Sequence, residues 1–525
     1  MMKQLALTLV LTGAACTDSG EPGSVVPGGD PCIDNPGIAC AQATFVSAKI
    51  GSDANPGTRE LPVATIGAAL TNAVTIGRYP TTIILGEGAY VTKVELNNEV
   101  SILGGYQCDA TACTWLRDIF SYESAIVDVD FEGLVAHSGV TAATVIDGVM
   151  VVGIDGAPTV APGGAAVTLD GGSPTLRASR FHGGNITGGA AGSDGSVGLL
   201  VRGGTDSADV TIYGNEIVGG RAAGLSAGLV LSGAGAERAL VTGNTIRGGD
   251  GARSVGLLAT NTIDGSVVER NDIASGIATV GASDGLVVSS ALTINANHIN
   301  TDRASVGACA TTTAFCTGIT SSSATATITN NVILGGNGAR TAGVVLAETE
   351  RPGGEIVLNS NLIDGGGASA ATGTSVALVV SIGACTTCGF TGVVGRVRNN
   401  VLVGGSSQTR FGILENPAAQ GQTIRPEVIE NNDIWFTGGA QATDTLYRRI
   451  LATGEAADFA TADLMNDLAL PSAAANLDVN PLYDTTWHAM TGSPCANAGT
   501  ASDAPARDLD GQLRTGITDI GPDEL

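Results

Sequence analysis

Aspartates near the end of the chain follow a pattern that can bind a divalent cation. Asp508 and Asp510 are separated by one residue and followed by glycine, and Asp519 comes later in the same stretch. Carboxylates at this spacing begin many calcium-binding loops. No glutamate follows at the spacing of a full EF-hand loop, and Arg514 stands between the aspartates. We therefore favour a salt-bridged structural cap, and expect no cofactor other than a possible Ca2+ ion.

Cysteines are the second group with chemistry of their own. Eight of the ten fall into close pairs, namely Cys32 and Cys40, Cys108 and Cys113, Cys309 and Cys316, and Cys385 and Cys388. In an exported chain such pairs are typical of local disulfides. A zinc site made of the last four is the alternative. One of these pairs precedes its glycine-containing strand and the other follows its strand, so the four sulfurs should lie at different corners and not meet.

Other candidate acids, bases and ligands are scattered. The histidines are His137, His182, His298 and His488, and the tryptophans are Trp115, Trp435 and Trp487. A glycosidase needs two carboxylates facing each other across one bond, but Asp250, Asp272 and Asp364 stand at different offsets in separate repeats. We interpret them as turn or solvent-facing residues, and His298 as a surface residue. No catalytic constellation is evident, and whether a metal binds stays open.

Charge and composition exclude some partners. The net charge is −25, and lysine occurs only at Lys3, Lys49 and Lys93. Attraction to nucleic acid or to an anionic lipid surface is therefore not expected. With 76 glycines, 43% apolar residues and 4% aromatic residues, the core must be large but built from small side chains.

The first residues predict export. Residues 1–15 carry one charge and then an apolar run too short to span a bilayer, which is typical of a signal peptide. The sequence TGAAC resembles the lipobox of bacterial lipoproteins, in which the cysteine, here Cys16, is lipidated. Gly13 replaces the usual leucine, so cleavage after Ala15 without lipidation is the alternative. Residues 16–42 read as a flexible tether. We expect a bacterial envelope protein, an outer-membrane lipoprotein or a secreted one, whose contact with membrane is the anchor alone.

Two alternating phrases must position any site. An apolar strand with a glycine recurs at Gly198, Gly228, Gly256, Gly285, Gly318, Gly343, Ala377 (in place of glycine) and Gly412. An Asn-x-Ile/Val/Leu step recurs at Asn215, Asn244, Asn271, Asn297, Asn331, Asn361, Asn400 and Asn432. Most of these steps are followed by a Gly-Gly pair, as in NEIVGG. Successive phrases are never fewer than 12 residues apart, which sets a minimal repeat of 24 residues.

Such a repeat holds two or three short strands and cannot bury its apolar side alone. Repeats must therefore stack into a solenoid with a shared core. Stacked asparagines lie about 4.8 Å apart, where their amides can hydrogen-bond as a ladder. The Gly-Gly pairs suit corners that need positive φ. A β-sandwich is the alternative, but it does not require asparagine at one fixed place.

The two longest insertions in the repeat carry two of the cysteine pairs. Cys309 and Cys316 lie between Asn297 and Gly318, and the other pair follows Ala377. Stapled loops lose less entropy on contacting a partner, so they are candidate recognition loops. Protection from proteolysis is the equal alternative.

The chain divides into a series of segments. After a strand and a turn cluster, PVATIGAALTNAV has helical apolar spacing, and a short helix there would cover the open end of the first coil. We predict a signal peptide (1–15), a tether (16–42), an N-terminal cap with the first coil (43–107), coils with inserted loops (108–440), and last coils with a C-terminal cap (441–525). A monomer is expected.

Both ends resemble the extracellular right-handed parallel β-helix proteins of the pectate-lyase-like superfamily. The matching N-terminal residues are Gly51, Asp53, Asn55, Pro56, Gly57, Thr58, Pro62, Thr65, Ile66, Ala69, Gly88 and Tyr90. The C-terminal motifs are NPLY, GSPCANAG, DLDGQLR and DIGPDE. The resemblance covers about residues 45–525 and implies an all-β, single-stranded right-handed β-helix with caps at both ends. It also implies that Cys495, at a small buried position, is a buried free thiol.

The resemblance bears on fold more than on activity. Polysaccharide lyases of this superfamily use a lysine or arginine base with Ca2+, and its polygalacturonases use clustered aspartates. Here the only lysines available are Lys49 and Lys93 in the cap, and Arg247 or Arg253 is conceivable as an arginine base. We therefore expect an exported surface protein with a structural or binding role toward polysaccharide or a surface protein. A polysaccharide lyase or glycosidase is the alternative, on fold analogy alone.

Overall fold

The computed structural model describes residues 43–76, 80–156, 163–188, 195–203, 209–232, 238–260, 265–301, 315–322, 325–348, 356–367, 373–382, 391–393, 395–416, 423–451, 453–469 and 471–525. All structural statements concern these residues. The predicted signal peptide and tether, with Cys16, Cys32 and Cys40, lie outside them, as do Cys309, Cys385 and Cys388. Within the described part, no helix is long and apolar enough to cross a membrane.

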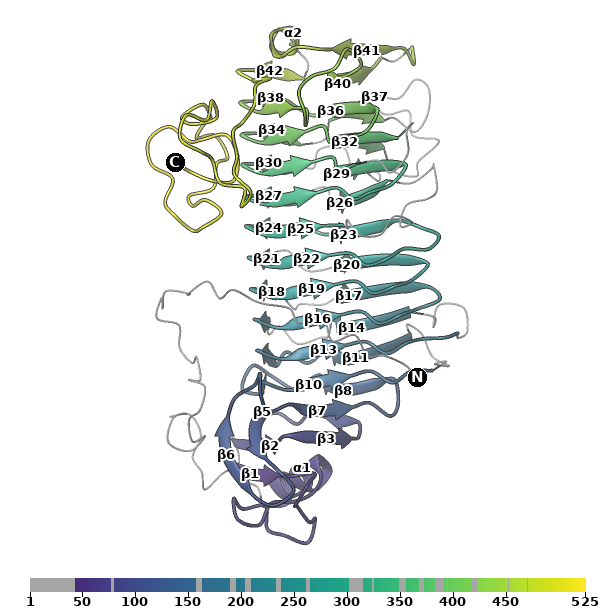
Figure 1. The fold of residues 1–525 in the computed structure, drawn as a ribbon, viewed down its shortest axis with the longest axis vertical. Coiled ribbons are helices and arrows are strands. Elements are labelled where there is room, and N and C mark those ends of the chain that lie inside the picture. Colours follow the sequence, from purple (N-terminus) through teal and green to yellow (C-terminus); the bar gives the residue numbers. More distant parts are fainter. Residues whose placement is uncertain are drawn as a thin grey trace, which may run out of the picture.

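Three parallel sheets wind around one axis, and each coil adds one strand to each sheet (Figure 1). Sheet A holds β1 (Ala43–Val46), β2 (Thr81–Gly86), β5 (Val100–Cys108), β9 (Val145–Asp147), β12 (Thr175–Arg177), β15 (Val210–Tyr213), β18 (Ala239–Thr242), β21 (Ser266–Glu269), β24 (Leu292–Asn295), β27 (Thr327–Thr329), β30 (Val357–Asn359), β34 (Arg396–Arg398), β38 (Val428–Glu430) and β42 (Ser472–Ala474), with β6 (Cys113–Arg117) antiparallel to β5.

Sheet B follows sheet A in every coil. It holds β3 (Gly88–Val91), β7 (Ser124–Val127), β10 (Met150–Val152), β13 (Arg180–His182), β16 (Glu216–Val218), β19 (Thr245–Arg247), β22 (Asp272–Ala274), β25 (His298–Asn300), β28 (Val332–Leu334), β31 (Leu362–Asp364), β35 (Val401–Val403) and β39 (Asp433–Trp435).

Sheet C has the longest strands and carries the glycine phrase. It holds β4 (Val94–Glu95), β8 (Glu132–His137), β11 (Gly163–Asp170), β14 (Gly195–Arg202), β17 (Leu225–Ser232), β20 (Arg253–Thr260), β23 (Ser283–Val288), β26 (Cys316–Ser321), β29 (Arg340–Glu348), β32 (Thr374–Ile382), β36 (Thr409–Asn416), β40 (Thr445–Ile450) and the antiparallel β41 (Ala456–Phe459). β33 (Thr391–Val393) and β37 (Thr423–Arg425) form a small separate sheet. The all-β solenoid predicted from the repeats is confirmed.

The glycine phrase is explained by the close approach of sheets B and C. Each sheet B strand points one residue into the core, such as Ile246 in β19 and Ile299 in β25, both fully buried. A Cβ atom on Gly228 would lie 2.9 Å from Cγ2 of Ile246, and one on Gly285 would lie 2.7 Å from Cγ2 of Ile299. Side chains do not pack that closely, so these positions of sheet C exclude larger residues.

The eight asparagines of the Asn-x-Ile/Val/Leu step form a continuous ladder between sheets A and B. In each rung the side-chain amide donates to the Oδ1 of the next asparagine, for example from Asn244 to Asn271 at 2.9 Å. The backbone N–H of Asn244 donates to the same oxygen at 2.9 Å. The ladder begins at the backbone N–H of Ser179 and continues beyond Asn432 to Asn476. Buried amides that are fully hydrogen-bonded in this way fix the register of every coil.

The predicted role of the Gly-Gly pairs is wrong for most coils. Among the described pairs, positive φ occurs at Gly366 and Gly405, whereas the pairs in the earlier coils have ordinary φ values. The glycines are needed because corners of successive coils stack closely: a Cβ on Gly249 would lie 2.2 Å from the carbonyl oxygen of Gly220. Serines line this corner on sheet C. Ser226 Oγ donates to the Gly220 carbonyl at 2.6 Å and accepts from the Gly249 N–H at 2.9 Å.

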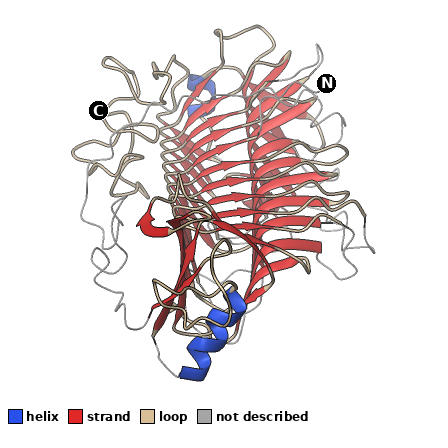
Figure 2. Cartoon of the chain, turned by 60° about the horizontal axis from the view of Figure 1, so that its bottom comes forward, coloured by secondary structure: helices blue, strands red, loops and turns tan. Residues whose placement is uncertain are grey.

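Short helices lie at the two ends of the solenoid (Figure 2). α1 (Ile66–Ile76) buries Ile66, Ala69 and Ala73 against the first coil and contacts β1 and β2, as the helical apolar spacing predicts. α2 (Ala462–Asn466) contacts β41 and β42 at the other end. Both helices cover apolar residues that no further coil covers.

The last stretch of the chain turns back along the side of the solenoid (Figure 1, yellow). Residues 480–525 form what we call the side cap. Its Cys495 and Ile520 pack with Val332, Leu362 and Val401 on the outer face of sheet B. Cys495 is a buried free thiol, and Cys108 and Cys113 form a disulfide between β5 and β6. Cys316 is also disulfide-bonded.

Candidate functional site

The outer face of sheet C is apolar over many coils. Two residues per strand point outward in register, and from β14 to β36 they are mostly aliphatic. They include Val197, Leu200, Ala227, Val230, Ala342, Val345, Val376, Val379, Phe411 and Leu414. In the middle of the sheet these positions turn polar, as Asp284 in β23 and Thr317 and Thr320 in β26. We call this interruption the polar notch.

Asp284 is the centre of the polar notch. Its side chain is 4% exposed, and its Oδ2 accepts a hydrogen bond from Arg253 Nη2 at 3.1 Å. Oδ1 accepts from Thr317 Oγ1 at 2.7 Å and more weakly from Thr320 at 3.4 Å. Burial raises the pKa of Asp284, and the positive charge of Arg253 opposes that rise. A carboxylate held on both oxygens is a rigid orienting group, because each of its partners fixes its geometry.

Arginines mark the same edge of sheet C on both sides of the notch. Arg253 and Arg340 occupy equivalent register positions three coils apart, which corresponds to about 14 Å. The side chain of Arg253 is 42% exposed beyond its contact with Asp284. The guanidinium carbon of Arg340 lies 4.1 Å from the ring centroid of Phe315, and burial lowers the pKa of Arg340. Two oriented guanidinium groups on one face can donate several hydrogen bonds to an elongated ligand.

The polar notch lies at the base of one predicted recognition loop. Thr317 directly follows Cys316, the cysteine that begins β26 and is disulfide-bonded. Its predicted partner Cys309 and most of that insertion lie outside the described residues. The end of the insertion places Phe315 against Arg340 and Thr317 against Asp284 of the notch.

Further predicted candidates lie in sheet B or just after its strands, and most of them form surface ion pairs. Arg247 Nη2 lies 3.9 Å from Asp272 Oδ2, and His298 Nδ1 lies 3.3 Å from Asp272 Oδ1. Asp250 pairs with Arg221 at 3.4 Å, and Asp364 accepts the N–H of Gly366 at 2.7 Å. The interpretation of these aspartates as turn or surface groups agrees with their contacts.

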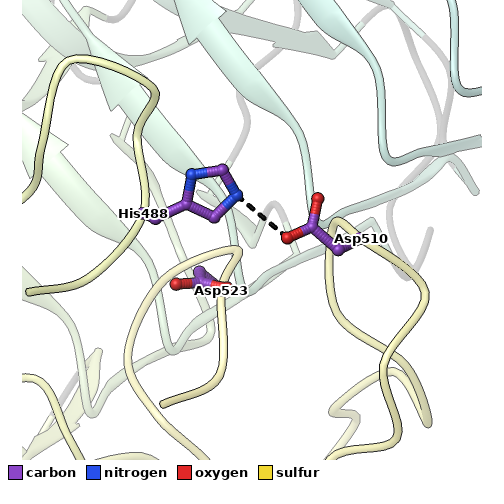
Figure 3. Close-up of side chains that lie close together, drawn as sticks. All are labelled: His488, Asp510 and Asp523. Atoms are coloured by element: carbon purple, nitrogen blue, oxygen red, sulfur yellow. Dashed lines mark hydrogen bonds and ion pairs between the residues drawn. The ribbon is translucent and has the colours of Figure 1, made fainter. Parts of the chain in front are cut away.

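A second cluster lies in the side cap (Figure 3). His488, Asp510 and Asp523 each place one nitrogen or oxygen atom within 4.8 Å of the others. Asp519, a member of the predicted acidic group, does not join them: its oxygens accept the N–H groups of Asn497 at 2.6 Å and Leu525 at 2.8 Å. Arg514 pairs with Glu524 at 2.9 Å. The predicted group is thus divided: Arg514 pairs with Glu524 instead, Asp519 accepts backbone N–H groups, and Asp510 belongs to a separate cluster with a histidine.

Sequence analysis named single members of both clusters, such as Arg253 and His488, but could not group them, and the reason differs between the two clusters. Asp284, Arg253 and Thr317 are about 30 residues apart along the chain, and only the coil register brings them together. His488 meets Asp510 through irregular segments without periodicity. One sequence signal for the position of the side cap was available. Asn-Asn doublets occur at 330–331, 399–400 and 431–432, and the first asparagine of each doublet donates a hydrogen bond to a carbonyl of the side cap.

No protein-family model and no curated protein matches the chain. Solved structures similar to it include the A-module of the mannuronan C-5 epimerase AlgE4 of Azotobacter vinelandii, at 15% identity and TM-score 0.39 over 77% of this chain and 98% of that chain. XylC in complex with xylose is similar at 12% identity and TM-score 0.39 over 91% and 98%. The Gp54 tailspike of Acinetobacter baumannii bacteriophage AP22, in complex with a capsular saccharide, is similar at 10% identity and TM-score 0.31 over 73% and 76%. TM-scores this low carry no argument about function.

Proposed function

We propose that the chain is an exported β-helix protein that binds a neutral polysaccharide on the outer face of sheet C. The observation that carries the proposal is the polar notch with Arg253 and Arg340 along one edge of an otherwise apolar face. Arg253, oriented by Asp284 of the notch, and Arg340 supply donors, and the flanking aliphatic residues supply apolar surface. Export, with Cys16 as a lipid anchor, belongs to the same proposal and rests on the sequence alone.

Charge favours a neutral polymer. The chain carries a net charge of −25, which repels a polyanion at a distance. The charge of Arg253 is balanced by Asp284 at 3.1 Å. A guanidinium group oriented by a buried carboxylate donates its remaining N–H groups to hydroxyl oxygens without needing a negative ligand.

The test is a binding assay on residues 17–525 against neutral and acidic polysaccharides. Arg253→Gln and Arg340→Gln should each weaken binding to a neutral polymer by about tenfold, because a hydrogen bond to a charged group contributes about 1.5–3 kcal/mol. Arg238→Gln is the matched control, since Arg238 pairs with Asp209 at 3.0 Å away from sheet C. Circular dichroism verifies that all variants fold. Equal affinities for the three variants would disprove the proposed face.

A second candidate is polysaccharide lyase activity on an acidic polymer. One observation favours it: burial lowers the pKa of Arg340, and an arginine base needs a lowered pKa. The measurement is the ultraviolet absorbance of unsaturated products from acidic polysaccharides, with and without Ca2+. Product formed by the wild type and not by Arg340→Gln would establish this activity. No product across the panel would remove this candidate and leave binding.

A further inference from the structure

Three separate segments of the side cap meet at His488. An antiparallel bridge between Tyr483 and Ala489 holds the first segment. The N–H of Leu509 donates to the Pro522 carbonyl at 2.8 Å, which joins the second segment to the third. Asp523 Oδ2 then accepts the N–H of Ala489 at 2.9 Å, which joins the third to the first. These segments have no regular secondary structure, so a shared ligand would stabilise their arrangement.

The side chains at this junction have the donors of a metal site. His488 Nε2 lies 2.9 Å from Asp510 Oδ2, and Asp523 faces both (Figure 3). On the other side of the ring, Nδ1 lies 2.9 Å from Thr486 Oγ1. Metal-binding histidines commonly use the second ring nitrogen for a hydrogen bond that fixes the ring. Thr486 provides such a partner while leaving Nε2 toward the two carboxylates.

Asp508 provides an independent observation. It is 2% exposed, and its Oδ1 accepts the N–H of Gln512 at 2.7 Å. Its Oδ2 is buried and has no hydrogen-bond partner among the described residues. A buried carboxylate oxygen without a partner is costly unless a cation is nearby.

Asp508 belongs to the same group of carboxylates as Asp510 and Asp523. The charges of Asp508 and Asp510 both act on the carboxyl group of Asp523. The nearest arginines of the segment are engaged elsewhere, Arg514 with Glu524 and Arg507 with the Gly511 carbonyl at 2.6 Å. Three carboxylates therefore lie close together with one imidazole among them.

We propose that His488, Asp510 and Asp523 bind one divalent transition-metal ion, with the buried carboxylate of Asp508 beside it. An imidazole nitrogen among carboxylate oxygens suits Zn2+ or Mn2+, whereas Ca2+ sites are built from oxygen ligands. The ion links the three segments and holds the side cap in the shape that packs on sheet B. The site is distinct from the polar notch, and its test does not depend on polysaccharide binding.

The experiment measures metal content and thermal stability of the full chain. After EDTA treatment and dialysis against Zn2+, Mn2+ or Ca2+ separately, mass spectrometry of the metal should find one equivalent of Zn2+ or Mn2+ per chain. The unfolding temperature should rise with the concentration of that ion.

Variants locate the ion. His488→Gln and the isosteric Asp510→Asn should each lose the bound equivalent and the rise in unfolding temperature. His298→Gln is the matched control, because His298 is also a partly exposed histidine paired with an aspartate, and it should keep both. Circular dichroism in EDTA shows whether each variant folds without metal. Absence of stoichiometric Zn2+ or Mn2+, binding of Ca2+ alone, or binding unchanged in both site variants would overturn the proposal.

Discussion

The outer face of sheet B differs between the two halves of the solenoid although the backbone is the same. In β13 to β25 the first outward residue of each strand is polar, and several form ion pairs, such as Arg180 with Glu123 at 2.9 Å and Asp272 with His298 at 3.3 Å. In β28 to β35 the equivalent residues are aliphatic, including Val332, Leu362 and Val401 in the same register. They lie under the side cap. The inward-facing residues form the same apolar stack in both halves. Only the outward-facing residues differ, according to whether the side cap covers the coil.

The corner between sheets A and B shows the same contrast. The residue before each ladder asparagine has positive φ in both halves. In the open half, the part of the solenoid that the side cap leaves uncovered, it is Gly214, Gly243, Arg270 or Ala296, and the two glycines are exposed. In the covered half it is asparagine in three of four coils and Ser360 in the other. Asn399 donates to the Thr500 carbonyl at 2.8 Å while accepting the N–H of Thr500 at 2.7 Å. One backbone geometry therefore serves two purposes, a bare turn and a docking point for the side cap.

The largest effect is expected from a charge placed on each face. Leu362→Arg would bury an unpaired charge between Val332 and Val401 under the side cap, and should destabilise the protein by about 3–5 kcal/mol. Thr245→Arg at the equivalent open position has Glu216 and Asp272 beside it, so stability should change by less than about 0.5 kcal/mol. Thermal unfolding measures the stability of both variants, and limited proteolysis measures how readily each is cleaved within residues 480–525. Similar losses in the two variants would contradict the contrast.

Two aspartates at equivalent positions should respond to pH in opposite directions. In the covered half, burial raises the pKa of Asp433 from its ordinary 3.8 to about 7. A raised carboxyl pKa contributes stability that is complete below pH 3.8 and is lost as the pH rises through about 7. In the open half, the hydrogen bond from His298 lowers the pKa of Asp272, so its contribution is present above pH 3.8 and is lost as the pH falls further.

The measurement is unfolding stability between pH 3 and pH 8. Asp433→Asn should remove a fall of a few kcal/mol between about pH 4 and pH 7, since each unit of pKa shift corresponds to about 1.4 kcal/mol. Asp272→Asn should leave that fall in place. A wild-type curve that is flat over this range, or one that Asp433→Asn does not alter, would refute the assignment.

The ladder should be equally important in both halves. Asn244→Ala in the open half removes an amide that donates to the Ile212 carbonyl at 2.9 Å and to Asn271 Oδ1 at 2.9 Å. Asn331→Ala in the covered half removes the same contacts, to Ile294 at 2.9 Å and Asn361 at 3.0 Å. Each leaves buried groups unpaired, so each should cost about 2–3 kcal/mol. Unfolding in denaturant compares them, and a loss confined to one half would show that the side cap governs ladder strength.

The sequence predicts the features that recur in every coil, but not the sites that form when residues from neighbouring coils come into register. Glycine and asparagine recur because identical positions lie above one another, so the coils and the fold class could be read directly. The polar notch could not be predicted in this way. Asp284 and Thr317 lie in register on neighbouring strands, but the insertion before β26 hides this register in the sequence. The Gly-Gly prediction failed because composition alone does not separate a positive-φ turn from close packing of corners. The His488 cluster could not be predicted, since it lies in irregular chain.

The smallest effect should come from exchanging the corner residues between the halves. Asn399→Gly keeps the positive φ but removes both hydrogen bonds to Thr500, and should cost about 1–2 kcal/mol. Gly243→Asn creates an Asn-Asn doublet in the open half, where a new Cβ would meet its nearest atoms at 3.9 and 4.0 Å. Because asparagine tolerates this conformation and no side cap lies there to accept its bonds, stability should change by less than about 0.5 kcal/mol. If Gly243→Asn stabilised the protein as much as Asn399→Gly weakened it, asparagine would stabilise the turn itself. Hydrogen bonding to the side cap would then not explain the doublets.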